Sequence, residues 1–183
     1  MGRPSNNFNM SISKLPVHFA RSSLQGGCSN SEWPESCFYD YRLMHWHYTP
    51  LAMIWKGFTR TEGDSKFHDA VSGTQKAEGK KLSPKDGVCF APSVEVGAGR
   101  AATQENILKC FETNDFYFLY STLHVDEEKV IGVIYWVPTS LIRVWFEEIG
   151  TKSGSICYSK FMKKMETVPI EESPVMRRGF PPI

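Results

Sequence analysis

Two apolar runs that follow each other closely constrain the fold of this chain more than any other feature. The first, DFYFLYSTL, covers residues 115–123, and the second, VIGVIYWV, covers residues 130–137. The charged segment VDEEKV makes a turn between them. A strand that is apolar at nearly every position, and not only at every second one, is typically buried on both faces of its sheet. The two runs therefore predict neighbouring strands inside a sheet that other elements cover on both sides.

Helical patterns flank these two strands. Before them, TQENILKCFET has Thr103 in the N-cap position and places Ile107, Leu108 and Phe111 on one face. After them, TSLIRVWFEEIG reads as a helix closed by Gly150. A short strand, SICY, and a basic helix, SKFMKKM, follow. This order predicts an α/β or α+β fold, in which helices flank a central mixed sheet.

The composition of the chain changes along its length. Residues 1–32 are rich in Ser, Asn and Gly, and we expect a loosely ordered N-terminal arm with one short strand around LPVHFA. Residues 33–165 are expected to form a single α/β domain, because a chain of 183 residues suits one compact core. Residues 166–183 carry four of the 11 prolines, so we expect an extended C-terminal tail.

Aromatic residues are dense between residues 33 and 58. We expect this stretch to form two short helices, or one helix interrupted at Pro50, and to end at Gly57. His45 and His47 would share a face on a strand and could join a metal site there, whereas on a helix they diverge. The stretch is typical of a core or a subunit interface, although aromatic rings can also stack on bases.

Charge and cysteine content exclude several classes of protein. The chain has 21 basic and 20 acidic residues, a formal net charge of +1, and a histone-like DNA binder would be far more basic. The five cysteines form no CxxC pair, so we expect reduced thiols in the cytoplasm and neither a disulfide framework nor a zinc site. The first residues contain no long apolar run, so neither a signal peptide nor a membrane span is expected.

Three residues in HDAVSGTQKAEGKK (68–81) have the chemistry of a metal-dependent nuclease. Glu78 and Lys80 would point to the same face of a strand, because successive side chains alternate. Asp69 returns to that face if a turn forms at Gly73. Two carboxylates can hold Mg²⁺, which lowers the pKa of a bound water and offsets charge on phosphate oxygens. A nearby lysine can orient the water or stabilise the transition state.

The same residues have a plainer interpretation as a solvated loop. The spacing Glu-x-Lys occurs a second time in the chain, at Glu127 and Lys129, where we expect only exposed charges in a hairpin turn. A rival set of acidic residues also lies nearby, with Asp86 followed nine positions later by Glu95 in the segment SVEVG. In that register Arg100 or Lys109 would have to replace the lysine.

The order of these segments resembles the PD-(D/E)xK nuclease superfamily, and within it the small type II restriction endonucleases. TRTEGDSKFHDAVSGTQKAEGKK is similar to the family's acidic segment running into Glu-x-Lys. QENILKCFETNDFYFLYS resembles its helix leading into an apolar strand, and VIGVIYWVPTSLIRVWFEE its next strand, turn and helix. The family usually has an apolar residue where this chain has Gly79.

The resemblance, which spans residues 59–148, implies a restriction-endonuclease-like core and a Mg²⁺-dependent endonuclease acting on double-stranded DNA, as a homodimer and without a membrane. Asp69 and Glu78 would bind the metal, and Lys80 would orient the attacking water. Contacts to DNA phosphates are expected from four basic residues, Arg143, Lys160, Lys163 and Lys164. Two alternatives stay open: a non-catalytic module that binds nucleic acid or protein, and a β-rich ligand-binding or scaffold protein.

Overall fold

The computed structural model of this chain describes residues 10–24, 34–61, 68–91, 103–151 and 154–181. Its helices are α1 (Arg21–Leu24), α2 (Glu35–Phe38), α3 (Tyr41–Lys56), α4 (Gln104–Thr113), α5 (Thr139–Ile149) and α6 (Tyr158–Met165). Its strands are β1 (Ile12–Ala20), β2 (Thr59–Arg60), β3 (Ala70–Ser72), β4 (Gln75–Lys81), β5 (Val88–Cys89), β6 (Phe116–Val125), β7 (Lys129–Pro138), β8 (Ser155–Ile156), β9 (Ile170–Glu172) and β10 (Met176–Arg178).

The centre of the fold is an eight-stranded mixed sheet, in the order β10-β1-β7-β6-β4-β3-β2 with β9 also paired to β1. The two apolar runs form β6 and β7, which pair antiparallel in the middle of this sheet, as the sequence predicts. On the other side of β6 lies β4, which runs parallel to it. A parallel neighbour requires a crossover connection, and α4 lies in the segment that joins β4 to β6.

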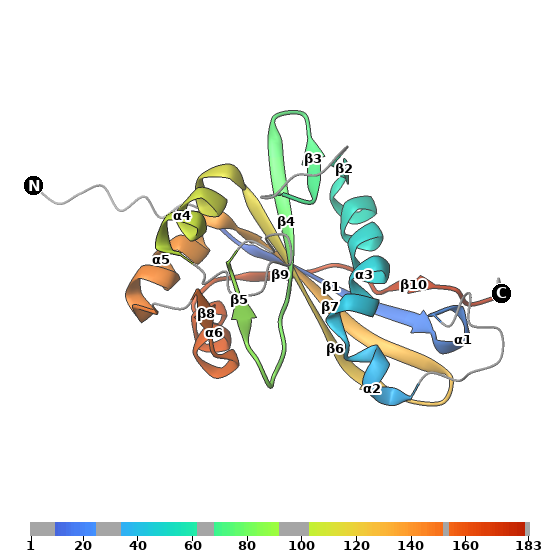
Figure 1. Cartoon of the computed structure of the whole chain (residues 1–183). Coiled ribbons are helices and arrows are strands. Elements are labelled where there is room, and N and C mark those ends of the chain that lie inside the picture. Colours follow the sequence, from blue (N-terminus) through green and yellow to red (C-terminus); the bar gives the residue numbers. More distant parts are fainter. Residues whose placement is uncertain (1–9, 25–33, 62–67, 92–102, 152–153, 182–183) are drawn as a thin grey trace, which may run out of the picture.

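Helices cover both faces of the sheet, which confirms the predicted fold class. Figure 1 shows α3 on one side of the sheet and α4, α5 and α6 on the other. The side chains of β6 alternate between these layers: Phe118 and Tyr120 belong to the core under α3, whereas Tyr117 and Leu119 belong to the core under α4, α5 and α6. Each face of the central strands is thus buried, which explains why they carry so few polar residues.

The strand expected around LPVHFA is present in the N-terminal region, but it is longer than predicted, and residues 1–9 and 25–32 of the predicted arm lie outside the described residues. Residues 12–20 form β1, which pairs antiparallel with β7 along eight positions and also borders β9 and β10. Ile12, Leu15, Val17 and Phe19 are all buried in β1. Their near-alternation is the pattern of a strand, and it outweighs the Ser- and Asn-rich composition around it.

The aromatic stretch and the C-terminal tail match their predictions in part. The aromatic stretch contains one short helix, α2, and one long helix, α3, which continues through Pro50 and is not interrupted there. Gly57 ends α3 in a left-handed conformation, with φ of +71°. The tail is extended, as expected, but it adds two short strands parallel to β1. Within the described residues, no helix has both the length and the apolar character needed to cross a bilayer.

Candidate active site

The hairpin of β3 and β4 brings Asp69 next to Glu78. The strands pair Ser72 with Gln75 and Ala70 with Ala77, and Gly73 makes the turn with φ of +58°. Asp69 directly precedes β3, and its backbone N–H donates to the carbonyl of Ala77 at 2.9 Å. Its carboxylate then accepts a hydrogen bond from the backbone N–H of Gly79 at 2.9 Å. The side chain of Asp69 therefore satisfies a backbone donor of β4 just beyond the end of the β3–β4 pairing.

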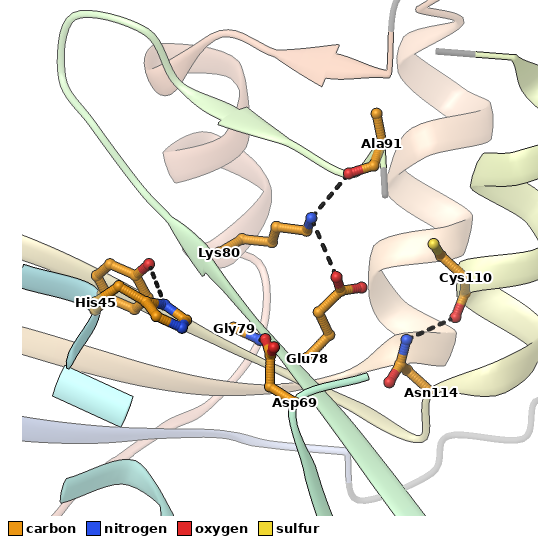
Figure 2. Close-up of polar contacts among 9 residues, drawn as sticks. His45, Asp69, Glu78, Gly79, Lys80, Ala91, Cys110 and Asn114 are labelled. Carbon is orange, nitrogen blue, oxygen red and sulfur yellow. Dashed lines mark hydrogen bonds and ion pairs between the residues drawn. The ribbon is translucent and has the colours of Figure 1, made fainter. Parts of the chain in front are cut away.

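Glu78 and Lys80 project from β4 toward the layer of α4 and are paired with each other. Lys80 Nζ lies 3.2 Å from Glu78 Oε1 and donates a hydrogen bond of 2.8 Å to the carbonyl of Ala91 (Figure 2). Only 2% of Glu78 and 8% of Lys80 is exposed. The predicted solvated loop is thus wrong for these two residues, because both are buried within the sheet.

Burial and charge act in opposite directions on this pair. Burial raises the pKa of Glu78 to about 7; the Asp69 carboxylate adds to this rise, and Lys80 opposes it. Burial alone would lower the pKa of Lys80, but the Glu78 carboxylate outweighs it, so the pKa of Lys80 is raised. Glu78 Oε2 has no hydrogen-bond partner among the described residues although it is buried. An additional positive charge at this point would stabilise the ionised carboxylate.

The wall of the site on the α4 side is neutral. Cys110 on α4 and Tyr117 on β6 are fully buried. Burial raises the pKa of Cys110 to about 12 and also raises the pKa of Tyr117, and the negative charge of Glu78 contributes to both shifts. Neutral, buried neighbours lower the local dielectric constant, which strengthens every charge interaction in the site.

Phe118 explains why the residue between Glu78 and Lys80 is a glycine. A Cβ on Gly79 would lie 2.3 Å from Cε2 of Phe118, far inside normal contact distance. The Phe118 ring is fully buried and stacks on Trp136, with 6.0 Å between ring centroids and an angle of 10° between the planes. Gly79 therefore marks a close approach of β4 to an aromatic layer.

The two histidines of α3 diverge, as expected for a helix. His47 makes an edge contact with Phe19, with ring centroids 6.3 Å apart. His45 Nδ1 lies 3.0 Å from the hydroxyl of Tyr120, and its ring lies beside Asp69 (Figure 2). The sequence pattern alone did not connect His45 with Asp69, Glu78 and Lys80. Its spacing of three from the buried Tyr48 was the available signal, since both then face the sheet.

Of the alternative set of site residues, only Asp86 and Lys109 lie among the described residues. Asp86 lies in the turn between β4 and β5 and pairs with Lys81 at 3.2 Å. Lys109 is exposed on α4 and lies 3.4 Å from Glu105. Glu95 and Arg100 lie outside the described residues, so this alternative stays a prediction.

The basic residues predicted to contact DNA lie on α5 and α6. Arg143 is exposed and lies 3.8 Å from Glu147, and Lys164 pairs with Glu148. Lys160 and Lys163 are exposed on α6. Their role in binding stays a prediction.

The residues present fit a magnesium ion better than a transition metal. Among the described residues there is no group of three or more His, Cys, Asp and Glu side chains that could hold a metal ion. Mg²⁺, however, is usually bound through one or two carboxylates, with waters and substrate phosphates completing its shell. Asp69 and Glu78 supply two carboxylates, and the orphaned Oε2 of Glu78 is a suitable ligand atom.

Comparisons with known proteins do not add to these observations. No protein-family model, no curated protein and no solved structure matched this chain.

Proposed function

We propose that this chain is a Mg²⁺-dependent endonuclease that hydrolyses phosphodiester bonds in double-stranded DNA. One observation carries the proposal: Asp69 and the pair Glu78 and Lys80 come together from adjacent segments of a hairpin, with Glu78 Oε2 buried and without a hydrogen-bond partner in the part of the chain that the structure describes. The combination of two carboxylates and a lysine is the one that the resemblance to PD-(D/E)xK nucleases implies. The following helix α4 and apolar strand β6 occur in the order expected from that resemblance.

Each residue has a distinct role in the proposed reaction. Asp69 and Glu78 would hold Mg²⁺, which when bound would lower the pKa of a water and offset charge on the scissile phosphate. Gly79 N–H keeps the Asp69 carboxylate oriented. Lys80 has three N–H donors, of which two point to Glu78 and to the Ala91 carbonyl. The third would orient the attacking water or stabilise negative charge on the phosphate.

The substrate and the assembly follow from the chemistry of cutting both strands. A two-fold homodimer carries one site per subunit, so each site can cut one strand of a symmetric sequence. Phosphate contacts from Arg143, Lys160, Lys163 and Lys164 would position the duplex without reading its sequence.

A non-catalytic binding module is the second candidate, and the internal pairing of Glu78 with Lys80 favours it. A buried ion pair can serve a structural purpose, because each partner compensates the charge of the other. Such a module would bind nucleic acid or protein on the same fold without hydrolysing it.

Digestion of mixed plasmid and phage DNA by the purified protein tests both candidates. The reactions contain Mg²⁺ or EDTA, and the variants are Glu78→Gln and Lys80→Met, which preserve side-chain volume. The matched controls are Glu127→Gln and Lys129→Met, which change the second Glu-x-Lys of the chain. Glu127 lies in the turn between β6 and β7, and Lys129 is the first residue of β7. We expect discrete fragments that require Mg²⁺, with the rate reduced at least about 100-fold in the site variants and unchanged in the controls.

Other outcomes of this experiment would contradict the proposal in specific ways. Cleavage that survives both site substitutions would move the reaction to Asp86 and Glu95. Folded protein that binds DNA with Mg²⁺ but leaves every substrate intact would establish the binding module.

A further inference from the structure

His45 approaches the candidate site from the opposite face of the sheet. It lies on α3, whereas Glu78 and Lys80 point toward α4. Asp69 joins the two sides: its carboxylate is bonded to Gly79 N–H, and its negative charge acts on the pKa of His45. Figure 2 shows the His45 ring beside Asp69, on the side away from Glu78.

One edge of the His45 ring is held by hydroxyl groups. Nδ1 lies 3.0 Å from the hydroxyl of Tyr120 and 3.4 Å from Oγ1 of Thr49, one turn along α3. Tyr120 is itself fixed, since only 2% of it is exposed and its ring stacks on Tyr48 with centroids 5.2 Å apart. Since Nδ1 faces Tyr120, the other ring nitrogen, Nε2, lies on the side of Asp69 (Figure 2).

The hydrogen bonds of the His45 imidazole bear on which of its nitrogens carries a proton. A neutral imidazole carries one N–H, and the partner of each nitrogen decides which one is protonated. When the Tyr120 hydroxyl donates to Nδ1, the proton resides on Nε2, where it faces the carboxylate.

We propose that His45 is a positioning residue for Asp69: fixed at Nδ1 by the Tyr120 hydroxyl, it directs Nε2–H at the carboxylate and sets the orientation in which Asp69 binds metal. This inference rests on the metal site proposed above. The Asp69 carboxylate accepts a hydrogen bond from a backbone N–H of β4, and the proposed orientation of His45 would direct an imidazole N–H at it from the side of α3. Groups that orient metal ligands in this way typically change metal affinity or activity by about 10- to 100-fold when they are removed.

Substitution of His45 by glutamine or asparagine distinguishes the roles of its two ring nitrogens. In His45→Gln the amide nitrogen can occupy the place of Nε2, whereas in His45→Asn it can occupy only the place of Nδ1. Tyr120→Phe removes the hydroxyl and leaves the ring. His47→Asn is the matched control, because it changes a histidine of the same helix that contacts Phe19 and not the site.

Two measurements apply to each variant: Mn²⁺ binding, followed by electron paramagnetic resonance without DNA, and the Mg²⁺ concentration that gives half-maximal cleavage. We expect His45→Asn and Tyr120→Phe to weaken Mn²⁺ binding and to raise the half-maximal Mg²⁺ concentration, each about 10-fold or more. His45→Gln and His47→Asn should stay within about 3-fold of wild type, and the KM for DNA should not change.

Two results would overturn the inference while leaving the nuclease intact. One is metal binding by His45→Asn that equals that of wild type. The other is an equal loss in His45→Asn and His45→Gln that parallels a loss of stability in urea, since a merely structural role predicts that pattern. Wild-type protein that binds no Mn²⁺ and cuts no DNA would instead overturn the proposed function, and this inference with it.

Discussion

Gly79 should be intolerant of any side chain, and the reason is geometric. The Cβ of alanine at this position would lie 2.3 Å and 2.4 Å from two carbons of the Phe118 ring, where ordinary contacts begin at about 3.4 Å. The ring cannot swing aside easily, because it is fully buried and stacked on Trp136. Overpacking of this kind typically destabilises a protein by about 1–3 kcal/mol, and a shortfall of about 1 Å against a fixed ring belongs at the upper end.

Urea unfolding, followed by circular dichroism, measures this effect. With a slope of about 2–3 kcal/mol per molar urea for a chain of this size, Gly79→Ala should lower the midpoint by roughly 1 M. Phe118→Leu removes the ring carbons that clash. The double variant should therefore lose at least about 1 kcal/mol less than the sum of the two single losses, because residues in contact couple.

Gly73→Ala provides the control for backbone strain. Gly73 has φ of +58°, but no atom lies within 4 Å of the point that a Cβ would occupy, so alanine there would cost stability through its conformation and not through a clash. The stability lost in Gly73→Ala should simply add to the stability lost in Phe118→Leu, because the two residues are not in contact. A midpoint for Gly79→Ala within about 0.2 M of wild type, or a loss that Phe118→Leu does not relieve, would refute the steric argument.

Two other predictions concern charge and capping. Burial raises the pKa of Glu78 from 4.5 to about 7, so in EDTA its contribution to stability is complete below pH 4.5 and is lost as the pH rises to about 7. Between these pH values, the free energy of unfolding of wild type, measured in urea, should fall by up to roughly 3 kcal/mol relative to that of Glu78→Gln. If the two free energies change with pH in parallel, the prediction is wrong. Thr103 Oγ1 accepts a hydrogen bond from Asn106 N–H at 3.2 Å, so Thr103→Ala should cost about 1 kcal/mol in urea unfolding, whereas Thr103→Ser should retain most of that stability. Equal midpoints for the two Thr103 variants would contradict the cap.

The elements that sequence predicts best are those whose burial is uniform. Strands β6 and β7 are apolar at most positions because both of their faces are covered over most of their length, and α4 and α5 carry their caps, Thr103 and Gly150, in the expected places. β1 was predicted only as a short strand around LPVHFA, because the residues around it are polar, although its near-alternating apolar positions are the pattern of a longer strand. Which strand pairs with β7 depends on contacts between residues more than 100 positions apart, and local patterns carry little information about such contacts.

The sequence indicated which residues form the candidate site, but it did not indicate that they are buried. Alternation along β4 and a turn at Gly73 suffice to bring Asp69, Glu78 and Lys80 together. The interpretation as a solvated loop failed because polarity usually indicates exposure, whereas Glu78 and Lys80 compensate each other inside the protein. His45 lies on α3, across the sheet, and the packing of that helix on Tyr120 places its ring beside Asp69 (Figure 2).

Stability alone gives little reason for a sequence to keep Glu78 and Lys80 where they are. A buried ion pair loses much of its attraction to desolvation, and apolar residues of similar size often stabilise a protein as well or better. Here one carboxylate oxygen is also left without a partner among the described residues, which costs further free energy. Departures of this kind from the usual pattern of a sheet interior are expected at functional sites, where a residue is retained for its chemistry. The polar strand β4 therefore supports the proposal that Glu78 is retained for binding a ligand.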